Sequence, residues 1–212
     1  MGYPEHAMKP HVRPLDESLV VCGPARTALY MEMHYVEAGI NPYELEIQLI
    51  DDLKPGEVAV MACPQGGRVA PWGELLSTAS KARAAAGCVT DGLVRDVPGL
   101  DGVGLPVFGR GVSPNSPQKD GPGTIGLAVA IGGLVVGPGD LVVADGDGVV
   151  IVPLATLDDV QRRLAIFALD ATENGRPIDM ALPQPVIWWS DDGEEAAVAV
   201  QADAHETEDG ET

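Results

Sequence analysis

Short apolar runs separated by turns dominate the hydrophobic pattern of the chain. Runs over 18–22, 58–63, 88–90 and 106–108 are rich in Val, Ala and Cys and are bounded by Gly, Pro or charged residues. Such runs are typical of buried strands, and further strands are expected at 28–35, 125–131 and 134–136. The stretch GDLVVADGDGVVIVP, residues 139–153, predicts two strands joined by a tight turn at Asp145 to Gly148.

Three segments have helical spacing instead. Residues 42–52 are the first, and a helix after Thr156 is the last. The clearest covers 74–86, with Gly87 expected to cap its C-terminus. The apolar positions that predict the inward faces are Leu45, Leu49 and Leu53 in the first helix, Leu75, Leu76, Ala79, Ala82 and Ala86 in the second, and Leu157, Val160, Leu164 and Phe167 in the third.

Short strands that outnumber helices predict a mixed α/β fold, a β/β/α layered domain rather than a Rossmann sheet. A length of 212 residues favours one domain. We expect an N-terminal arm over 1–18, the domain over 19–180 and an acidic, flexible tail over 181–212. The chain has no GxGxxG at a helix start and no GxxxxGK[ST], which disfavours a nucleotide-phosphate cradle.

Charge and cysteine usage narrow the possible partners and the compartment. The formal net charge is −19, which argues against nucleic acid and anionic membranes as partners. Nine acidic residues and no Lys or Arg follow Ser190, so much of the charge belongs to the tail. Three separated cysteines and no signal peptide indicate reduced thiols in a cytoplasmic protein.

The candidate chemistry lies between Pro71 and Asp96. Gly73 and Glu74 begin the clearest helix, where unpaired backbone N–H groups and the helix dipole favour an anion. A substrate carboxylate could bind the amides of Gly73, Glu74, Leu75 and Leu76. The alternative is that Gly73 only makes a turn and Glu74 only complements the dipole of its own helix.

Arg95 and Asp96 follow the next strand, at its C-terminal end. Because that strand begins near the end of the preceding helix and runs back, its far end should return to the helix start. Glu74, Arg95 and Asp96 can then converge. The alternative is an exposed ion pair of little consequence.

Convergence would make a divalent-metal site. Asp96 is a hard oxygen ligand for Mg²⁺ or Mn²⁺, Arg95 is a fork donor for a carboxylate or enolate oxygen, and Glu74 could hold a metal-bound water. A metal chelated by a 2-oxo-carboxylate stabilises the enolate that forms when the adjacent carbon–carbon bond breaks. This is the chemistry of a class II aldolase or decarboxylase.

These residues resemble one family, the RraA-like proteins, which include metal-dependent 4-hydroxy-4-methyl-2-oxoglutarate/4-carboxy-4-hydroxy-2-oxoadipate aldolases and regulators of ribonuclease E activity. Its acid–x20–Arg–Asp pattern stands here as Glu74 and Arg95-Asp96. Further matching stretches are GPART (23–27), PGEVAV (55–60), WGELLS (72–77), DGLVRD (91–96), PVFGRGVSP (106–114) and DGDGVVIVP (145–153).

The resemblance implies a swivelling β/β/α fold and a homotrimer or hexamer with sites at subunit interfaces. It implies substrate bound by Gly73 to Leu76 and Arg95, with the metal at Asp96. The expected activity is cleavage of a 4-hydroxy-2-oxo-dicarboxylate to pyruvate and an oxo-acid, together with oxaloacetate decarboxylation. The alternative is a non-catalytic, protein-binding regulator of ribonuclease activity.

Other mechanisms are disfavoured by the sequence. None of Cys22, Cys63 and Cys88 stands beside a His, as a catalytic thiol would require. A Schiff-base aldolase needs a buried Lys, whereas Lys81 falls on the polar face of its predicted helix.

Overall fold

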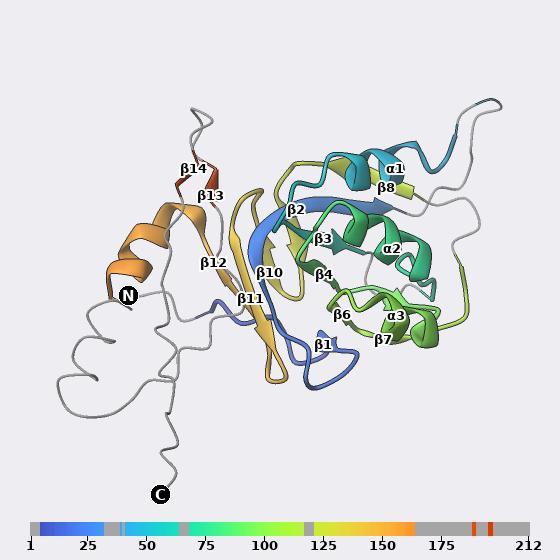
Figure 1. The fold of residues 1–212 in the computed structure, drawn as a ribbon, viewed down its shortest axis with the longest axis horizontal. Coiled ribbons are helices and arrows are strands. Elements are labelled where there is room, and N and C mark those ends of the chain that lie inside the picture. The colour runs from blue at the N-terminus through green and yellow to red at the C-terminus, as the bar shows by residue number, and fades with distance from the viewer. Residues whose placement is uncertain are drawn as a thin grey trace, which may run out of the picture. The chain divides into compact units, whose positions relative to one another are not determined.

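A bent eight-stranded sheet forms the centre of the first of two compact units, residues 1–179 (Figure 1). The computed structural model describes residues 5–31, 39, 41–63, 68–116, 121–163, 188–189 and 195–196. The strands follow the order β1-β6-β4-β3-β2-β11-β12, and β8 also pairs with β2. Their bounds are β1 Arg13–Pro14, β2 Val21–Met31, β3 Val58–Ala62, β4 Gly87–Thr90, β6 Val107–Gly109, β8 Gly121–Ile125, β11 Leu141–Asp145 and β12 Gly148–Val152.

The long strand β2 corrects the prediction of two strands separated at Gly23-Pro24. It runs unbroken because its partner changes along its length, from β11 at Val21–Pro24 to β3 at Ala25–Leu29 and then to β8. Gly23 serves close packing here, since a Cβ atom would overlap the carbonyl oxygen of Gly56. The predicted continuation beyond Met31 lies outside the described residues until Gly39.

The two faces of the sheet are both covered, which makes three layers. One face carries the helices α1 (Glu44–Asp51), α2 (Glu74–Ala82) and α3 (Val97–Val103), and the other carries the hairpin of β9 (Val129–Ile131) and β10 (Leu134–Val136). Successive side chains of strand β3 point to opposite faces of the sheet and so pack into two different cores. Ala59 and Met61 join the core under the helices, and its other three residues join the core of the hairpin side. The predicted mixed α/β, β/β/α layered fold is confirmed.

The helix predicted over 74–86 is shorter and differently oriented. It ends at Ala82, and Ala84, with φ 58°, makes the left-handed turn expected of Gly87. Gly87 instead begins β4, where a Cβ atom would lie 2.8 Å from the carbonyl oxygen of Pro106. The buried residues are Ser77 and Ser80, and Leu75 is 80 % exposed. The predicted inward face was therefore wrong except at Leu76 and Ala86, which pack against the cores.

The β11–β12 hairpin confirms the turn predicted from GDLVVADGDGVVIVP, with Asp145 paired to Gly148. The described part of residues 1–18 packs on the domain: Met8 and Val12 lie in its core, and β1 pairs with β6. Residues 157–163 are helical, and the rest of that predicted helix lies outside the described residues.

The second compact unit, residues 180–212, contains the predicted acidic tail. Its described part is an antiparallel pair of β13 (Trp188–Trp189) and β14 (Glu195–Ala196). The remainder of the predicted tail lies outside the described residues.

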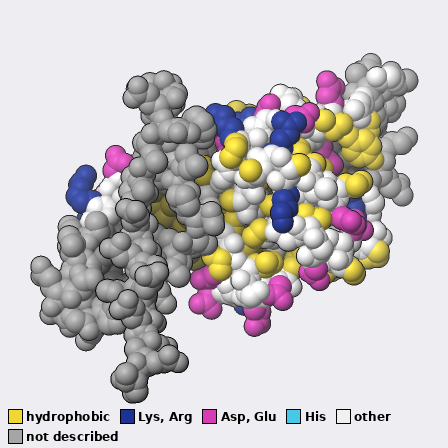
Figure 2. Space-filling view, in the orientation of Figure 1, with side chains coloured by type: hydrophobic (Ala, Val, Ile, Leu, Met, Phe, Trp, Pro, Cys, Tyr) yellow, Lys and Arg dark blue, Asp and Glu magenta, His cyan; other side chains and the backbone are white. Residues whose placement is uncertain are grey.

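Hydrophobic side chains gather on the surface where α1 and β8 lie (Figure 2). Tyr43 and Ile47 of this region are exposed, as are Met31 at the end of β2 and Leu127 after β8. Among the described residues, no helix is long and apolar enough to cross a lipid bilayer.

Candidate functional site

The start of α2 lies against the end of strand β5 (Leu93–Val94). Trp72 forms a parallel bridge with Val94, and the Arg95 amide donates to the Trp72 carbonyl at 3.0 Å. A Cβ atom on Gly73 would lie 2.7 Å from Asp96 Oδ2 and 3.0 Å from Arg95 Nε. The structure therefore brings the start of α2 to Arg95 and Asp96, as the predicted chain reversal requires, whereas the carboxyl group of Glu74 lies against Gly99, the third residue of the helix that follows Asp96.

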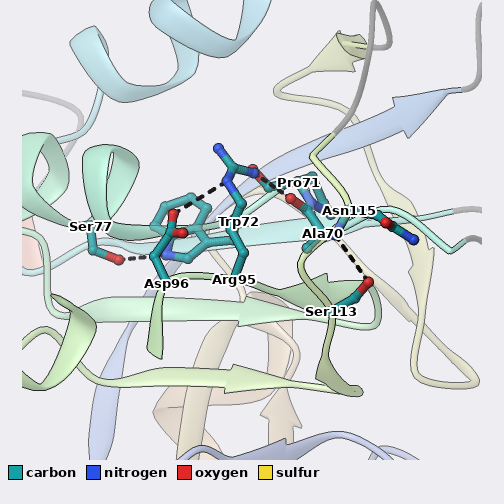
Figure 3. A network of polar contacts seen from close by, with 8 residues as sticks. All are labelled: Ala70, Pro71, Trp72, Ser77, Arg95, Asp96, Ser113 and Asn115. Atoms are coloured by element: carbon teal, nitrogen blue, oxygen red, sulfur yellow. Dashed lines mark hydrogen bonds and ion pairs between the residues drawn. The ribbon is translucent and has the colours of Figure 1, made fainter. Parts of the chain in front are cut away.

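The guanidinium group of Arg95 is held by the chain that precedes α2 (Figure 3). Its Nη1 donates to the carbonyl oxygens of Ala70 and, at 3.1 Å, Pro71, while Nε lies 3.4 Å from Asp96 Oδ2. The side chain is 18 % exposed. Figure 3 shows one terminal nitrogen pointing away from these contacts, so the fork keeps a donor directed elsewhere.

Asp96 occupies a left-handed backbone conformation, with φ 60° and ψ 36°, immediately before α3. Its carbonyl oxygen accepts hydrogen bonds from the amides of Gly99 and Leu100. Its side chain forms no capping hydrogen bond with α3 and is 48 % exposed. Backbone and side chain thus have separate roles, and the carboxylate remains accessible beside Arg95.

The side chain of Glu74 lies against α3. A Cβ atom on Gly99 would overlap the Glu74 carboxyl group and lie 2.9 Å from its Cγ. The absence of a side chain at residue 99 therefore lets Glu74 rest on the helix that Asp96 precedes. Leu75 is exposed and Leu76 is half-buried.

Trp72 and Ser77 hold the start of α2 against the core. Both side chains are fully buried, and Trp72 Nε1 donates to Ser77 Oγ at 2.7 Å. The Ser77 amide also donates to the Gly73 carbonyl at 3.1 Å, which closes the first helical turn. The Trp72–Ser77 bond anchors the Gly73 segment to the core, and the sequence did not predict it.

Glu46 of α1 is an acidic residue that the sequence analysis missed. Burial raises the pKa of its carboxyl group to about 6, and the positive charge of Arg95 opposes that rise. The signal was its spacing, because a residue three positions before Leu49 and four before Ile50 shares their buried face. The apolar spacing of Leu45, Leu49 and Leu53 alone does not point to this acid.

The donor set suits an ion that keeps most of its water. Among the residues that the structure describes, no three His, Cys, Asp or Glu side chains gather as a metal cluster. Mg²⁺ and Mn²⁺ sites commonly use only one or two protein carboxylates, with water and substrate completing the shell. Asp96, half exposed beside the Gly73 cradle that a Cβ would fill, fits that pattern.

The alternative nucleophiles do not fit. Burial raises the pKa of the Cys63 thiol to about 12, so it stays protonated near neutral pH. Lys81 is exposed and donates to the carbonyl oxygens of Val103 and Gly104 at the end of α3. Neither side chain has the environment of a covalent catalyst.

Known proteins are similar to this chain in sequence and in fold. A family model described as RraA-like, aldolase/RraA, matches residues 1–151. A Halalkalibacterium halodurans protein named "Putative 4-hydroxy-4-methyl-2-oxoglutarate aldolase" is 32 % identical over 152 residues, which are 72 % of this chain and 69 % of that protein. Streptomyces coelicolor RraAS2, described as an unusual member of the RNase ES inhibitor RraA family, is 28 % identical, with a TM-score of 0.70 over 83 % of this chain and 87 % of that one.

The RNA-processing inhibitor RraA from Thermus thermophilis shows the same fold at 23 % identity, with a TM-score of 0.56 over 71 % of this chain and 87 % of that one. The layered fold, the Glu74 and Arg95-Asp96 arrangement, and the match over residues 1–151 agree with one another. The chain belongs to the RraA-like family.

Proposed function

We propose that the protein is a divalent-metal-dependent lyase that cleaves a 4-hydroxy-2-oxo-dicarboxylate, such as 4-hydroxy-4-methyl-2-oxoglutarate, to pyruvate and a second oxo-acid. Oxaloacetate decarboxylation is a second reaction that the same enolate chemistry allows. The observation that carries the proposal is the contact of Gly73 with Arg95 and Asp96 at the start of α2. The name of the 32 % identical relative supports the same reaction class.

The substrate carboxylate would bind at the first turn of α2. The backbone amides of Gly73, Glu74, Leu75 and Leu76 begin the helix, where the dipole favours an anion. Gly73 presents no side chain, and the cation of Arg95 adjoins it. Together with the metal, these groups would provide local positive charge in a protein whose formal net charge is −19.

Asp96 would hold Mg²⁺ or Mn²⁺, and Glu74 would orient a water molecule beside it. When bound, the metal would stabilise negative charge on the 2-oxo oxygen as the carbon–carbon bond breaks. Arg95 would donate to the same developing oxyanion or to the adjacent carboxylate. Its bonds to the carbonyls of Ala70 and Pro71 keep it in place without reorganisation during the reaction.

The decisive experiment measures pyruvate formation from 4-hydroxy-4-methyl-2-oxoglutarate and from oxaloacetate, with MgCl2, with MnCl2 and with EDTA. We expect turnover that needs the metal and returns when EDTA is titrated out. Metal-independent turnover, or none with either substrate under any of these conditions, would count against the lyase.

A second function is supported by the likeness to RraAS2, whose description names an RNase ES inhibitor family. In that case the protein would be a non-catalytic, protein-binding regulator of ribonuclease activity that acts through its surface. Asp96→Asn separates the two functions in one preparation. A regulator would keep its inhibition of a ribonuclease after this change, whereas a lyase would lose its turnover.

A further inference from the structure

Glu46 is a buried acid whose position the packing of α1 alone does not explain. The residue is 8 % exposed and lies on the same face of α1 as Leu49 and Ile50. Within the described part of the structure, its Oε2 atom has no hydrogen-bond partner. A buried carboxyl oxygen without a partner lowers stability, and a glutamine or an apolar side chain would fill nearly the same volume at a lower cost.

The charge of Arg95 acts on the carboxyl group of Glu46. α1 and α2 contact each other on one face of the sheet, and Arg95 lies beside the start of α2. The cation of Arg95 lowers the pKa of the Glu46 carboxyl group against the stronger effect of burial. The two side chains therefore come within electrostatic range from elements far apart in the sequence.

We propose that Glu46 is a positioning residue for Arg95, whose buried carboxylate orients the guanidinium fork toward the substrate carboxylate or enolate. The inference rests on the proposed lyase function. Arg95 Nη1 is used by the carbonyls of Ala70 and Pro71, and Nε faces Asp96. When the charge of Asp96 is shared with a divalent ion, the carboxylate of Glu46 would still balance and align Arg95.

This role predicts that stability and function change in opposite directions. Replacing Glu46 with an uncharged isostere should stabilise the fold, because a poorly solvated charge is removed. The same change should weaken substrate binding, because Arg95 loses its alignment. A side chain with only a structural role would not produce this opposition.

The test compares Glu46→Gln with wild type, with Glu44→Gln as the matched control on the exposed face of α1. At pH 7.5 we expect Glu46→Gln to raise Tm, to raise KM about tenfold and to change kcat less, in line with the loss of one charge-assisted contact. Glu46→Asp keeps the charge and should recover part of the KM effect. Unchanged KM in Glu46→Gln, or a lower Tm, would overturn the inference.

Oxalate, a planar dianion shaped like the enolate of pyruvate, provides a binding readout that is independent of turnover. Calorimetry with MgCl2 should show about tenfold weaker oxalate binding in Glu46→Gln than in Glu44→Gln. Equal oxalate affinities in the two variants would also contradict the role of Glu46.

The coupling of Glu46 and Arg95 can be judged even if wild type neither turns over substrate nor binds oxalate, which would refute the proposed function. Tm is then measured for Glu46→Gln, Arg95→Gln and the double variant. The Tm gain from Glu46→Gln should be larger by at least about 2 °C in the Arg95→Gln background, since Glu46 there lacks its cation. Equal gains in both backgrounds would show that the residues are not coupled.

Discussion

The backbone of Gly73 lies directly against the carboxylate of Asp96, such that a Cβ atom on residue 73 would sit 2.7 Å from Asp96 Oδ2. The residue that precedes α2 and the residue that precedes α3 therefore form one site. The contact leaves no space for a side chain, and it places the helix amides beside a carboxylate and a guanidinium group.

Gly73→Ala should reduce activity strongly while leaving the protein folded. The φ of −162° at Gly73 is extended and allows alanine, so the damage comes from displacing Arg95 and Asp96. We expect kcat/KM for oxaloacetate decarboxylation to fall about 100-fold, with a loss of about 1–3 kcal/mol in unfolding free energy from overpacking.

Gly102→Ala is the control for that change, because a Cβ atom at residue 102 of α3 meets nothing within 4 Å. It should leave kinetics unchanged. Wild-type kinetics in Gly73→Ala would remove this contact from the proposed site.

Asp96→Asn tests the metal ligand without disturbing the backbone. Asparagine tolerates the left-handed conformation at φ 60°, whereas alanine would add strain. We expect Mn²⁺ affinity, followed by electron paramagnetic resonance, to fall more than roughly 100-fold, since residues that only support a metal ligand already contribute about 10–100-fold. Pyruvate formation should fall with it.

Asp101→Asn on the exposed surface of α3 is the matched control and should bind Mn²⁺ as wild type does. If Asp96→Asn binds Mn²⁺ equally well, the metal lies elsewhere.

Arg95→Lys should lose most activity although the positive charge is kept. A lysine ammonium cannot simultaneously donate to the carbonyls of Ala70 and Pro71, approach Asp96 and present a flat fork to the substrate. We expect kcat/KM to fall about 100-fold and the free energy of unfolding to fall by about 1–3 kcal/mol. Arg83→Lys, at an exposed pair with Asp51, should change neither quantity appreciably.

Retention of normal steady-state kinetics by Arg95→Lys would mean that planar, two-pronged donation plays no part in the reaction. A loss of stability alone would assign Arg95 a purely structural role.

The stability of the metal-free protein should depend on Glu46 in a defined pH window. Burial raises the pKa of this carboxyl group from about 4.5 to about 6, so the folded state favours its protonated form. The resulting penalty is absent below pH 4.5, grows between pH 4.5 and 6 and is constant above, where it amounts to about 2 kcal/mol.

Thermal unfolding at several pH values checks this sign. The Tm of Glu46→Gln should equal that of wild type at pH 4 and exceed it by about 5 °C at pH 7.5. A difference that is the same at both pH values, or that is larger at pH 4, would contradict a raised pKa.

The layered fold could be read from the sequence because both faces of the central strands carry apolar residues, as the runs at 58–63 and 88–90 show. The β11–β12 hairpin could also be predicted, since the residues that form its turn are adjacent in the sequence. Local patterns failed where a distant partner decided the outcome. β2 continues through Gly23-Pro24 because three different strands bond to it in turn. α3 forms from the sequence VPGLDGV, in which one Pro and two Gly obscure the helical spacing of Val97, Leu100 and Val103.

The sequence by itself determined which residue types the site could contain and, through the reversal of the chain after α2, that Gly73 and Arg95-Asp96 would meet. Only the tertiary structure decided how they meet. The serines of α2 face inward, where Ser77 bonds to Trp72, and Gly99 makes room for Glu74. α1, which lies outside the motif, places Glu46 within electrostatic range of Arg95. Side-chain electrostatics depend on distance in space and on exclusion of water, and neither quantity is encoded in the spacing of residues along the chain.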